Sequence, residues 1–184
     1  MKKVFSALAV CTLAFAACIP LGANAEQPLT PVPTVDVPRY LGTWYEIAKF
    51  PNRFQKMCAS NTSAAYSARP DGSLSVRNRC TGSDGKVSEV EGQARQTGGA
   101  TSPKLQVRFA PAWLSFLPFV WGDYWVIDLD ADYQLVAVSE PKREFLWILS
   151  RTPTVNAKAY DELLARLRSQ SLDTGKLEST RHTP

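Results

Sequence analysis

The sequence predicts an all-β fold, namely an eight-stranded antiparallel up-and-down β-barrel with one C-terminal α-helix packed outside it. Short segments rich in aromatic and β-branched residues recur from residue 44 to residue 150, with turn residues between them. Each segment is joined to the next by a short link, as antiparallel neighbours allow. A single segment with helical periodicity follows the last of them.

Eight strands are expected, each ending where a turn signal such as Pro70-Asp71-Gly72 begins. They are Trp44–Phe50, Asn61–Ala68, Ser73–Thr81, Lys86–Thr97, Lys104–Phe109, Trp121–Leu129, Tyr133–Ser139 and Glu144–Ser150. A closed barrel of eight strands encloses enough space for one small ligand.

The helix is expected over residues 153–170. Its apolar residues Ala159, Leu163, Leu164 and Leu167 recur every three or four positions and form one stripe. Thr152 is the expected N-cap, with Pro153 at the first helical position.

The N-terminus is typical of an export signal, with two lysines, an apolar stretch over residues 4–21 and the small-residue site Ala23-Asn24-Ala25. We expect residues 1–25 to be a signal peptide. A transmembrane anchor fits less well, because polar residues follow directly. Phe15-Ala16-Ala17-Cys18 also resembles a lipoprotein box, so acylation at Cys18 is the alternative to cleavage after Ala25. Either route predicts an exported protein of the periplasm or outer membrane.

The remaining chain is interpreted as one domain with short ends. Residues 26–38 contain four prolines and are interpreted as a linker that contributes little to the core. The barrel and its helix are expected over residues 39–178, and residues 179–184 form a tail.

Two cysteines, Cys58 and Cys80, follow the signal region. In an oxidising compartment such a pair predicts one structural disulfide. A metal or redox site is the weaker alternative, because a CxxC spacing is absent and the single histidine, His182, lies near the C-terminus.

The charge of the chain argues against nucleic-acid binding. The formal net charge is +4 from 21 basic and 17 acidic residues. Removing Lys2 and Lys3 with the signal leaves 19 basic residues, or 19 − 17 = +2. No cluster of lysine and arginine interleaves with aromatic residues, so a phosphate-binding surface is not expected.

Three stretches carry a family resemblance. Tyr40–Ala48 contains a Gly-x-Trp motif, Asp128–Tyr133 ends in Asp-Tyr, and Leu146–Pro153 contains Arg151. In this order, on eight strands, they resemble the three signature regions of the lipocalins. Residues 39–176 resemble the bacterial Blc-type outer-membrane lipocalins, relatives of apolipoprotein D.

The resemblance implies that these motifs meet at one closed end of the barrel, with Trp44 as the floor and Arg151 stacked on its indole. A guanidinium over an indole face is worth about 0.5–2 kcal/mol. The residues expected to close the barrel are Gly42, Trp44, Asp132, Tyr133 and Arg151.

Alternation along strands, anchored on Trp44 and Arg151 and aligned to the family, predicts the residues that face inward. The expected ligand-binding residues are Glu46, Ala48, Phe50, Ala64, Tyr66, Val76, Asn78, Val90, Val107, Phe109, Tyr124, Val126, Ala137, Phe145 and Trp147. Leu74, Ala94, Leu105, Leu135 and Leu149 are expected to face inward too. These side chains line an apolar cavity with a few orienting polar groups, or else fill a solid barrel.

An uncharged loop, Ala110–Val120, is expected at the open end and presents Trp113, Phe116 and Phe119. Such a loop can be a lid over the ligand, a contact with a membrane surface or a homodimer contact, or it can fold over its own barrel. The sequence leaves monomer and homodimer both open.

The predicted function is to bind and carry a small hydrophobic ligand; the resemblance implies a fatty acid or a lysophospholipid. Enzymatic activity is not expected, because a Ser-His or Cys-His arrangement needs a histidine other than the one in the tail. No cofactor is expected, since no inward His or Met is available to bind haem iron. The alternative is an envelope scaffold without a specific ligand.

Overall fold

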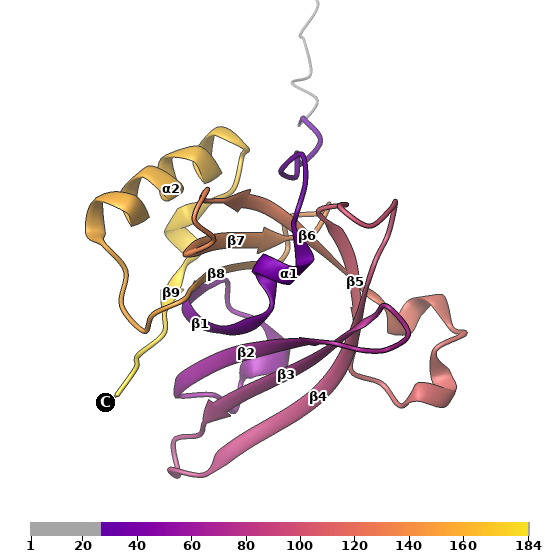
Figure 1. Ribbon diagram of the computed structural model, residues 1–184. Coiled ribbons are helices and arrows are strands. Elements are labelled where there is room, and N and C mark those ends of the chain that lie inside the picture. The colour runs from indigo at the N-terminus through magenta and orange to yellow at the C-terminus, as the bar shows by residue number, and fades with distance from the viewer. Residues whose placement is uncertain (1–26, 184) are drawn as a thin grey trace, which may run out of the picture.

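The computed structural model describes residues 27–183, so the expected signal peptide and Cys18 lie outside the described residues. One antiparallel sheet runs in the order β2-β3-β4-β5-β6-β7-β8-β1, and β1 also pairs with β2, which closes the barrel (Figure 1). The strands are β1 (Gly42–Lys49), β2 (Ser60–Ala68), β3 (Leu74–Thr81), β4 (Val87–Gln96), β5 (Lys104–Arg108), β6 (Gly122–Leu129), β7 (Leu135–Ser139) and β8 (Leu146–Ser150), followed by the two-residue β9 (Glu178–Ser179). The predicted barrel is confirmed.

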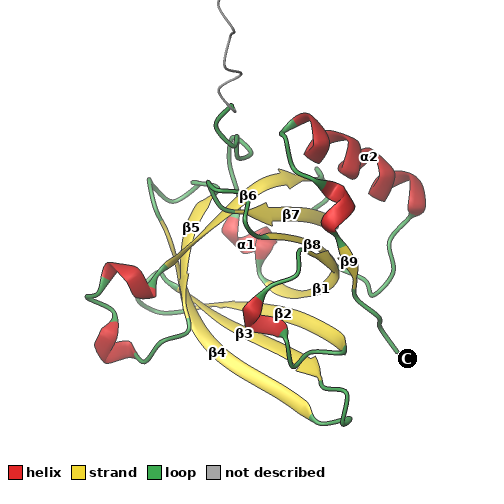
Figure 2. Ribbon diagram, turned by 180° about the vertical axis from the view of Figure 1, so that it is seen from behind, coloured by secondary structure: helices red, strands yellow, loops and turns green. Residues whose placement is uncertain are grey.

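The two ends of the barrel differ in their covering. A short helix, α1 (Val37–Tyr40), lies across one end, as seen from the front in Figure 1 and from behind in Figure 2. The other end carries 3₁₀ turns at Arg53–Gln55, Ala112–Leu114 and Pro118–Val120. We call the first the closed end and the second the mouth.

The C-terminal helix is present but shorter than predicted. Helix α2 (Ala157–Ser169) begins after Asn156, whose side-chain oxygen accepts a hydrogen bond from the Ala159 amide at 3.1 Å. The predicted N-cap, Thr152, instead donates its hydroxyl to the Thr154 carbonyl. An asparagine cap satisfies a free amide of the first turn, so the helix starts four residues later than the proline suggested.

Helix α2 buries Leu163 and Leu167 against the outside of the barrel. The outer cluster there also contains Leu146 and Ile148 from β8. The helix therefore packs outside the barrel, as predicted.

The Pro-rich segment before the barrel is not a free linker in its described part. Leu29 and Val35 are buried, and the amides of Val32 and Val35 donate to the carbonyls of Val126 and Thr101, each at 2.9 Å. Leu29, Val32 and Val35 are spaced three residues apart among the prolines, and their side chains hold the segment against the barrel.

The C-terminal tail also belongs to the fold. Strand β9 pairs with the mouth end of β1, and the Asn61 amide donates to the Arg181 carbonyl at 2.8 Å. Near the mouth β1 pairs with β8 and β9, while its pairing with β2 is confined to residues 42–45. The tail fills the space that opens between β1 and β2.

Two bulges invert the predicted inward and outward faces. The β1–β8 register shifts between Glu46 and Ala48, and the β6–β7 register shifts between Val126 and Asp128. An extra residue turns the following side chains to the opposite face. The prediction that Ala48, Phe50, Leu135 and Ala137 face the cavity is therefore wrong: Phe50, Leu135 and Ala137 pack in the outer cluster, and Ala48 pairs with Ile148 of that cluster.

Candidate functional site

The closed end is sealed by a cation on an indole. Trp44 is fully buried, and the Arg151 guanidinium carbon lies 3.8 Å from its ring centroid. Arg151 donates to the carbonyls of Thr43 at 3.0 Å and Arg39 at 2.7 Å. The indole Nε1 of Trp44 donates to the Tyr40 carbonyl at 2.9 Å. These contacts match the closing role predicted for both residues.

Gly42 and Tyr133 support the closed end, and the backbone of both residues lies in the left-handed region. Gly42 has φ +94°, and a Cβ there would lie 3.4 Å from the Arg151 guanidinium. Tyr133 has φ +58°, and its hydroxyl accepts a hydrogen bond from the Asp36 amide at 2.9 Å. The Arg39 guanidinium covers its ring at 4.1 Å.

The remaining predicted closing residue, Asp132, does not take this role, which belongs to Asp130, two positions earlier. Asp132 is exposed, whereas one carboxylate oxygen of Asp130 accepts hydrogen bonds from the amides of Gln134 and Leu135. The other accepts from the Asp132 amide at 3.1 Å. Asp130 is the acceptor that shapes this turn, because it precedes the free amides of the turn and Asp132 lies within it.

A cavity of about 740 Å³ opens at the mouth. Eleven of the fifteen predicted ligand-binding residues line it: Glu46, Ala64, Tyr66, Val76, Asn78, Val90, Val107, Phe109, Tyr124, Phe145 and Trp147. Val126 faces inward but lies in the core beneath the cavity, while Ala48, Phe50 and Ala137 lie outside for the reason given above. The barrel is therefore hollow rather than solid.

The floor of the cavity is built from tyrosines. The Tyr124 hydroxyl is hydrogen-bonded to those of Tyr40 and Tyr66, each at 2.8 Å. Burial raises the pKa of all three phenols, that of Tyr66 to about 12. The floor is therefore polar but uncharged at neutral pH.

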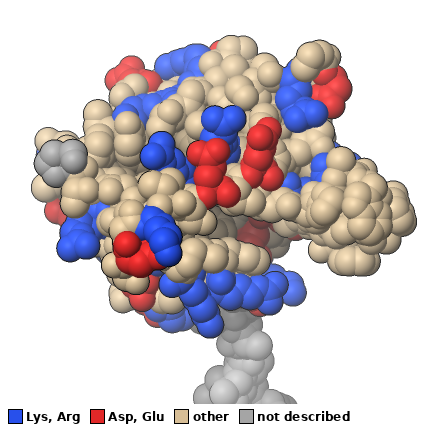
Figure 3. All heavy atoms as spheres, turned by 90° about the horizontal axis from the view of Figure 1, so that it is seen from below, with Lys and Arg blue, Asp and Glu red and all other residues tan. Residues whose placement is uncertain are grey.

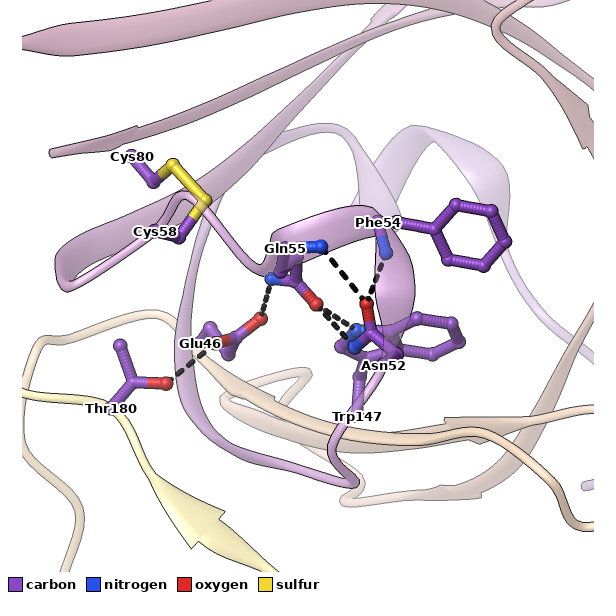
Figure 4. Close-up of a disulfide and its surroundings, with 8 residues drawn as sticks. All are labelled: Glu46, Asn52, Phe54, Gln55, Cys58, Cys80, Trp147 and Thr180. Carbon is purple, nitrogen blue, oxygen red and sulfur yellow. Dashed lines mark hydrogen bonds between the residues drawn. A yellow bond between two sulfur atoms is a disulfide. The ribbon is translucent and has the colours of Figure 1, made fainter. Parts of the chain in front are cut away.

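A polar network that the strand pattern did not predict stands at one side of the mouth (Figure 4). The Gln55 side chain donates to the Glu46 carboxylate and accepts from the Trp147 indole at 2.9 Å. Asn52 donates to the same Gln55 oxygen at 2.8 Å. Thr180 from the tail donates its hydroxyl to the other Glu46 oxygen.

Glu46 is buried in this network. Burial raises the pKa of its carboxyl, and the hydrogen bonds from Thr180 and Gln55 oppose the rise. The sequence indicated no partner for Glu46, because Gln55 and Thr180 come from a turn and from the tail, where no periodic pattern marks them. The network fixes the turn that forms part of the mouth.

The predicted disulfide is present. Cys58 and Cys80 are bonded, with their Cα atoms 5.5 Å apart. The bond ties the β1–β2 loop to the end of β3, and both residues line the cavity. It lies close to the Glu46 network (Figure 4).

The loop between β5 and β6 exposes its aromatic residues. Trp113, Phe116 and Phe119 are 73%, 74% and 79% exposed. Their loop projects from the body as a lobe without charged side chains (Figure 3). Trp121 holds the base of this loop in place. Its indole donates to the Ser115 carbonyl at 2.9 Å, and the Arg95 guanidinium carbon lies 4.0 Å from the centroid of its ring. The loop does not fold over its own barrel.

Charged groups other than Glu46 also line the cavity. Two arginines, Arg53 and Arg79, and two acidic residues, Asp123 and Glu140, are among the lining residues. Within residues 27–183 no group of three or more His, Cys, Asp or Glu side chains is placed to hold a metal ion. No helix in the same part of the chain is long and apolar enough to cross a membrane.

Residues 35–182 match the family described as a lipocalin-like domain. The chain is 39% identical to the outer membrane lipoprotein Blc of Escherichia coli strain K12 over 175 residues, which is 95% of this chain and 94% of that protein. It is 41% identical to temperature-induced lipocalin-1 of Arabidopsis thaliana over 148 residues, covering 79% and 78% of the two chains.

Among solved structures, insecticyanin of the tobacco hornworm Manduca sexta superposes with a TM-score of 0.65. The match covers 84% of this chain and 85% of that one at 20% identity. At this identity the likeness concerns the fold alone. It agrees with the closed eight-stranded barrel and its helix.

Proposed function

Because this chain belongs to the lipocalin family, whose barrels bind small hydrophobic ligands, we propose that it carries a single-chain lipid, a fatty acid or a lysophospholipid, in the bacterial envelope. The observation that supports this most directly is the open cavity of about 740 Å³. Its size falls within the range of about 300–1,000 Å³ that is usual for small-molecule sites.

The composition of the wall favours an acyl chain. Apolar side chains from five strands surround the cavity, among them Val76, Val107 and Leu149. Each methylene transferred from water contributes about 0.8 kcal/mol, so a long chain binds well with few polar contacts. Arg53 and Arg79 at the mouth are placed to neutralise an acidic head group left near solvent. Binding without chemical conversion is part of the proposal.

Filling the cavity is expected to weaken lipid binding. In the Ala64→Phe variant a phenyl ring takes up space in the cavity that Ala64 lines, and the affinity for a fluorescent fatty acid should fall at least tenfold. Ala65→Phe is the matched control, since Ala65 is the next residue of β2 and faces the other side of the sheet. Titration with both variants and the parent protein measures the effect. Failure of the parent protein to bind fatty acids and lysophospholipids would contradict the proposal and favour an envelope scaffold.

The proposed location follows from the relatives. The Escherichia coli relative is named an outer membrane lipoprotein, which supports export of this chain to the envelope. Whether residues 1–25 are removed or Cys18 is acylated concerns residues outside those described. The mass of the protein isolated from bacterial envelope distinguishes a chain that starts at Glu26 from one with an acylated Cys18.

We propose in addition that the β5–β6 loop contacts the membrane surface from which the ligand is taken. Trp113 and Phe116 extend into solvent, and Phe119 joins the same loop to the cavity wall. Aromatic rings on an uncharged loop insert favourably into the interface of a bilayer. The loop therefore offers a path from the bilayer to the cavity.

The double substitution Trp113→Ser with Phe116→Ser should reduce binding to phosphatidylethanolamine–phosphatidylglycerol vesicles at least tenfold, because two exposed rings are lost. Flotation of the signal-free chain with vesicles measures it. Affinity for the fluorescent fatty acid in solution should stay within twofold and serves as the control. If vesicle binding is unchanged, or if the substitution instead converts a dimer to a monomer, the loop has another role.

A further inference from the structure

The wall of the barrel is incomplete beside β4. Strand β4 runs over Val87–Gln96, but its pairing with β5 is confined to residues 93–96. After β5 the chain enters the β5–β6 loop, which runs away from the mouth end of β4 in Figure 1 and in Figure 2. Residues 87–92 therefore pair with β3 on one side only, and we call their other side the free edge.

The hydrogen bonds that flank β4 show which of its backbone groups point to the free edge. The Thr97 amide donates to the Lys104 carbonyl at 2.9 Å on the β5 side, and the Gly82 amide donates to the Lys86 carbonyl at 2.8 Å on the β3 side. Both pairs continue the registers of the two ladders, whose residue pairs follow without interruption. Because backbone groups alternate between the two sides of a strand, the odd-numbered residues of β4 direct their amides and carbonyls away from β3.

Glu89 and Glu91 therefore present unpaired backbone groups on the free edge. Within residues 27–183 the amides and carbonyls of these two residues make no backbone hydrogen bond across this edge. Their side chains are held elsewhere, since Glu89 is ion-paired with Arg77 at 3.5 Å and Glu91 accepts from the Ser75 hydroxyl at 2.8 Å. An unpaired strand edge of this kind is a template for another extended chain.

The free edge is continuous with the ligand cavity. Ser88 and Val90, which alternate with the two glutamates, line the cavity, and Phe109 lines it on the other side of the gap between the free edge and the β5–β6 loop. Val90 is 46% exposed and Phe109 is 40% exposed, although both belong to the cavity wall. The Phe109 ring lies against Gly92, where a Cβ would come within 2.6 Å of it, and the two segments part beyond this contact. A ligand that leaves the cavity through this gap passes along the free edge.

We infer that the free edge pairs with an extended peptide whose acyl chain lies in the cavity, so that the protein also carries N-acylated peptides. The inference rests on the proposed lipid binding and names a further class of lipid for the same cavity. An acyl chain fits the apolar wall, and a peptide supplies the alternating amides and carbonyls that a free strand edge binds. The side chains of such a peptide should be neutral or basic, since Glu89 and Glu91 lie along the edge.

A second copy of this chain is a less favourable occupant of the free edge. Two such edges related by a two-fold axis pair antiparallel through their odd-numbered residues. The registers with the greatest overlap place Glu89 of one copy opposite Glu89 or Glu91 of the other. Like charges directly opposite each other destabilise a pair of strands, and a peptide without acidic residues avoids this repulsion.

Three ligands separate pairing with the free edge from occupation of the cavity. N-dodecanoyl-tetraalanine amide carries donors and acceptors along its peptide, and the same molecule with every backbone nitrogen methylated lacks the donors. Dodecanoate measures the cavity alone. Displacement of a fluorescent fatty acid gives the affinity for each ligand. The parent protein should bind the unmethylated peptide at least tenfold more tightly than the methylated one, because methylation removes two or more hydrogen bonds.

The Glu89→Pro variant tests the protein side of the pairing. Proline removes the amide that points to the free edge and leaves the β3–β4 hydrogen bonds, to which residue 89 does not contribute. Affinity for the unmethylated peptide should fall at least fivefold, and affinity for dodecanoate should stay within twofold. Glu89→Ala is the matched control, because it removes the same side chain, which lies outside the cavity lining, and keeps the amide. Both affinities should stay within twofold in this control.

Equal affinity of the parent protein for the methylated and unmethylated peptides, with dodecanoate still bound, would overturn the pairing and leave the lipid carrier intact. Equal losses in Glu89→Ala and Glu89→Pro would overturn it too, as would a dimer of the parent protein that Glu89→Pro converts to monomers. If Glu89→Pro also loses affinity for dodecanoate, the comparison of the two peptides on the parent protein decides the question. A parent protein that binds neither dodecanoate nor the acylated peptides would contradict the carrier itself.

Discussion

The Trp44→Ala variant is expected to lose about 3–5 kcal/mol of unfolding free energy. Trp44 is fully buried, so its removal leaves a cavity at the closed end and exposes the inner core. The substitution also removes the surface on which Arg151 stacks and the indole that donates to Tyr40. Equilibrium unfolding in guanidinium chloride, monitored by circular dichroism, measures the loss.

Trp113→Ala provides the control for this experiment. The same change of side chain at a position 73% exposed in the mouth loop removes no core contact and should alter the unfolding free energy by less than about 0.5 kcal/mol. Equal losses in the two variants would mean that the closed end does not hold the barrel together. A loss confined to Trp44→Ala supports the role assigned to the indole.

Reduction of the disulfide is the second large effect expected. Cys58 and Cys80 are 22 residues apart, and opening a loop of this length costs about 3 kcal/mol by the loop-entropy estimate. The midpoint of guanidinium unfolding of the signal-free chain should therefore fall when a reductant is added. Ligand affinity should fall too, because both residues line the cavity and the bond fixes the loop that carries Gln55.

The Cys58→Ala, Cys80→Ala double variant shows whether the reductant acts on this bond. Without reductant this variant should already unfold at the lower guanidinium midpoint expected of the reduced parent protein, and adding reductant should not shift that midpoint further. An unchanged midpoint in the reduced parent protein would contradict a stabilising role. Combining these two substitutions with Trp44→Ala also tests whether the two ends contribute independently, since the losses from distant sites usually add.

The sequence was sufficient for the fold and for the closed end because both depend on local patterns. Turn residues delimit the strands, and the Gly42–Trp44 and Arg151 motifs sit on strand ends that an up-and-down barrel brings together. The disulfide followed from the cysteine count and the expected compartment. Predicting these features does not require the register between neighbouring strands.

The errors come from features that break the alternation. A bulge after Glu46 and another after Val126 invert the parity of the residues that follow them. Strand β7 is buried along its whole length, between the inner core and helix α2, so its composition does not distinguish the two faces. Gln55 and Thr180 contact Glu46 from segments whose sequence has no periodic hydrophobic pattern, and only the tertiary structure brings these residues together.

The start of the described chain bears on how the protein would sit on a membrane. The Gln27 carbonyl accepts a hydrogen bond from Arg143, which belongs to the β7–β8 loop at the mouth. Cys18 precedes Gln27 by 27 − 18 = 9 residues, and a chain of this length can span at most about 32 Å. An acyl anchor on Cys18 would therefore hold the rim of the barrel within about one bilayer thickness of the leaflet that carries it.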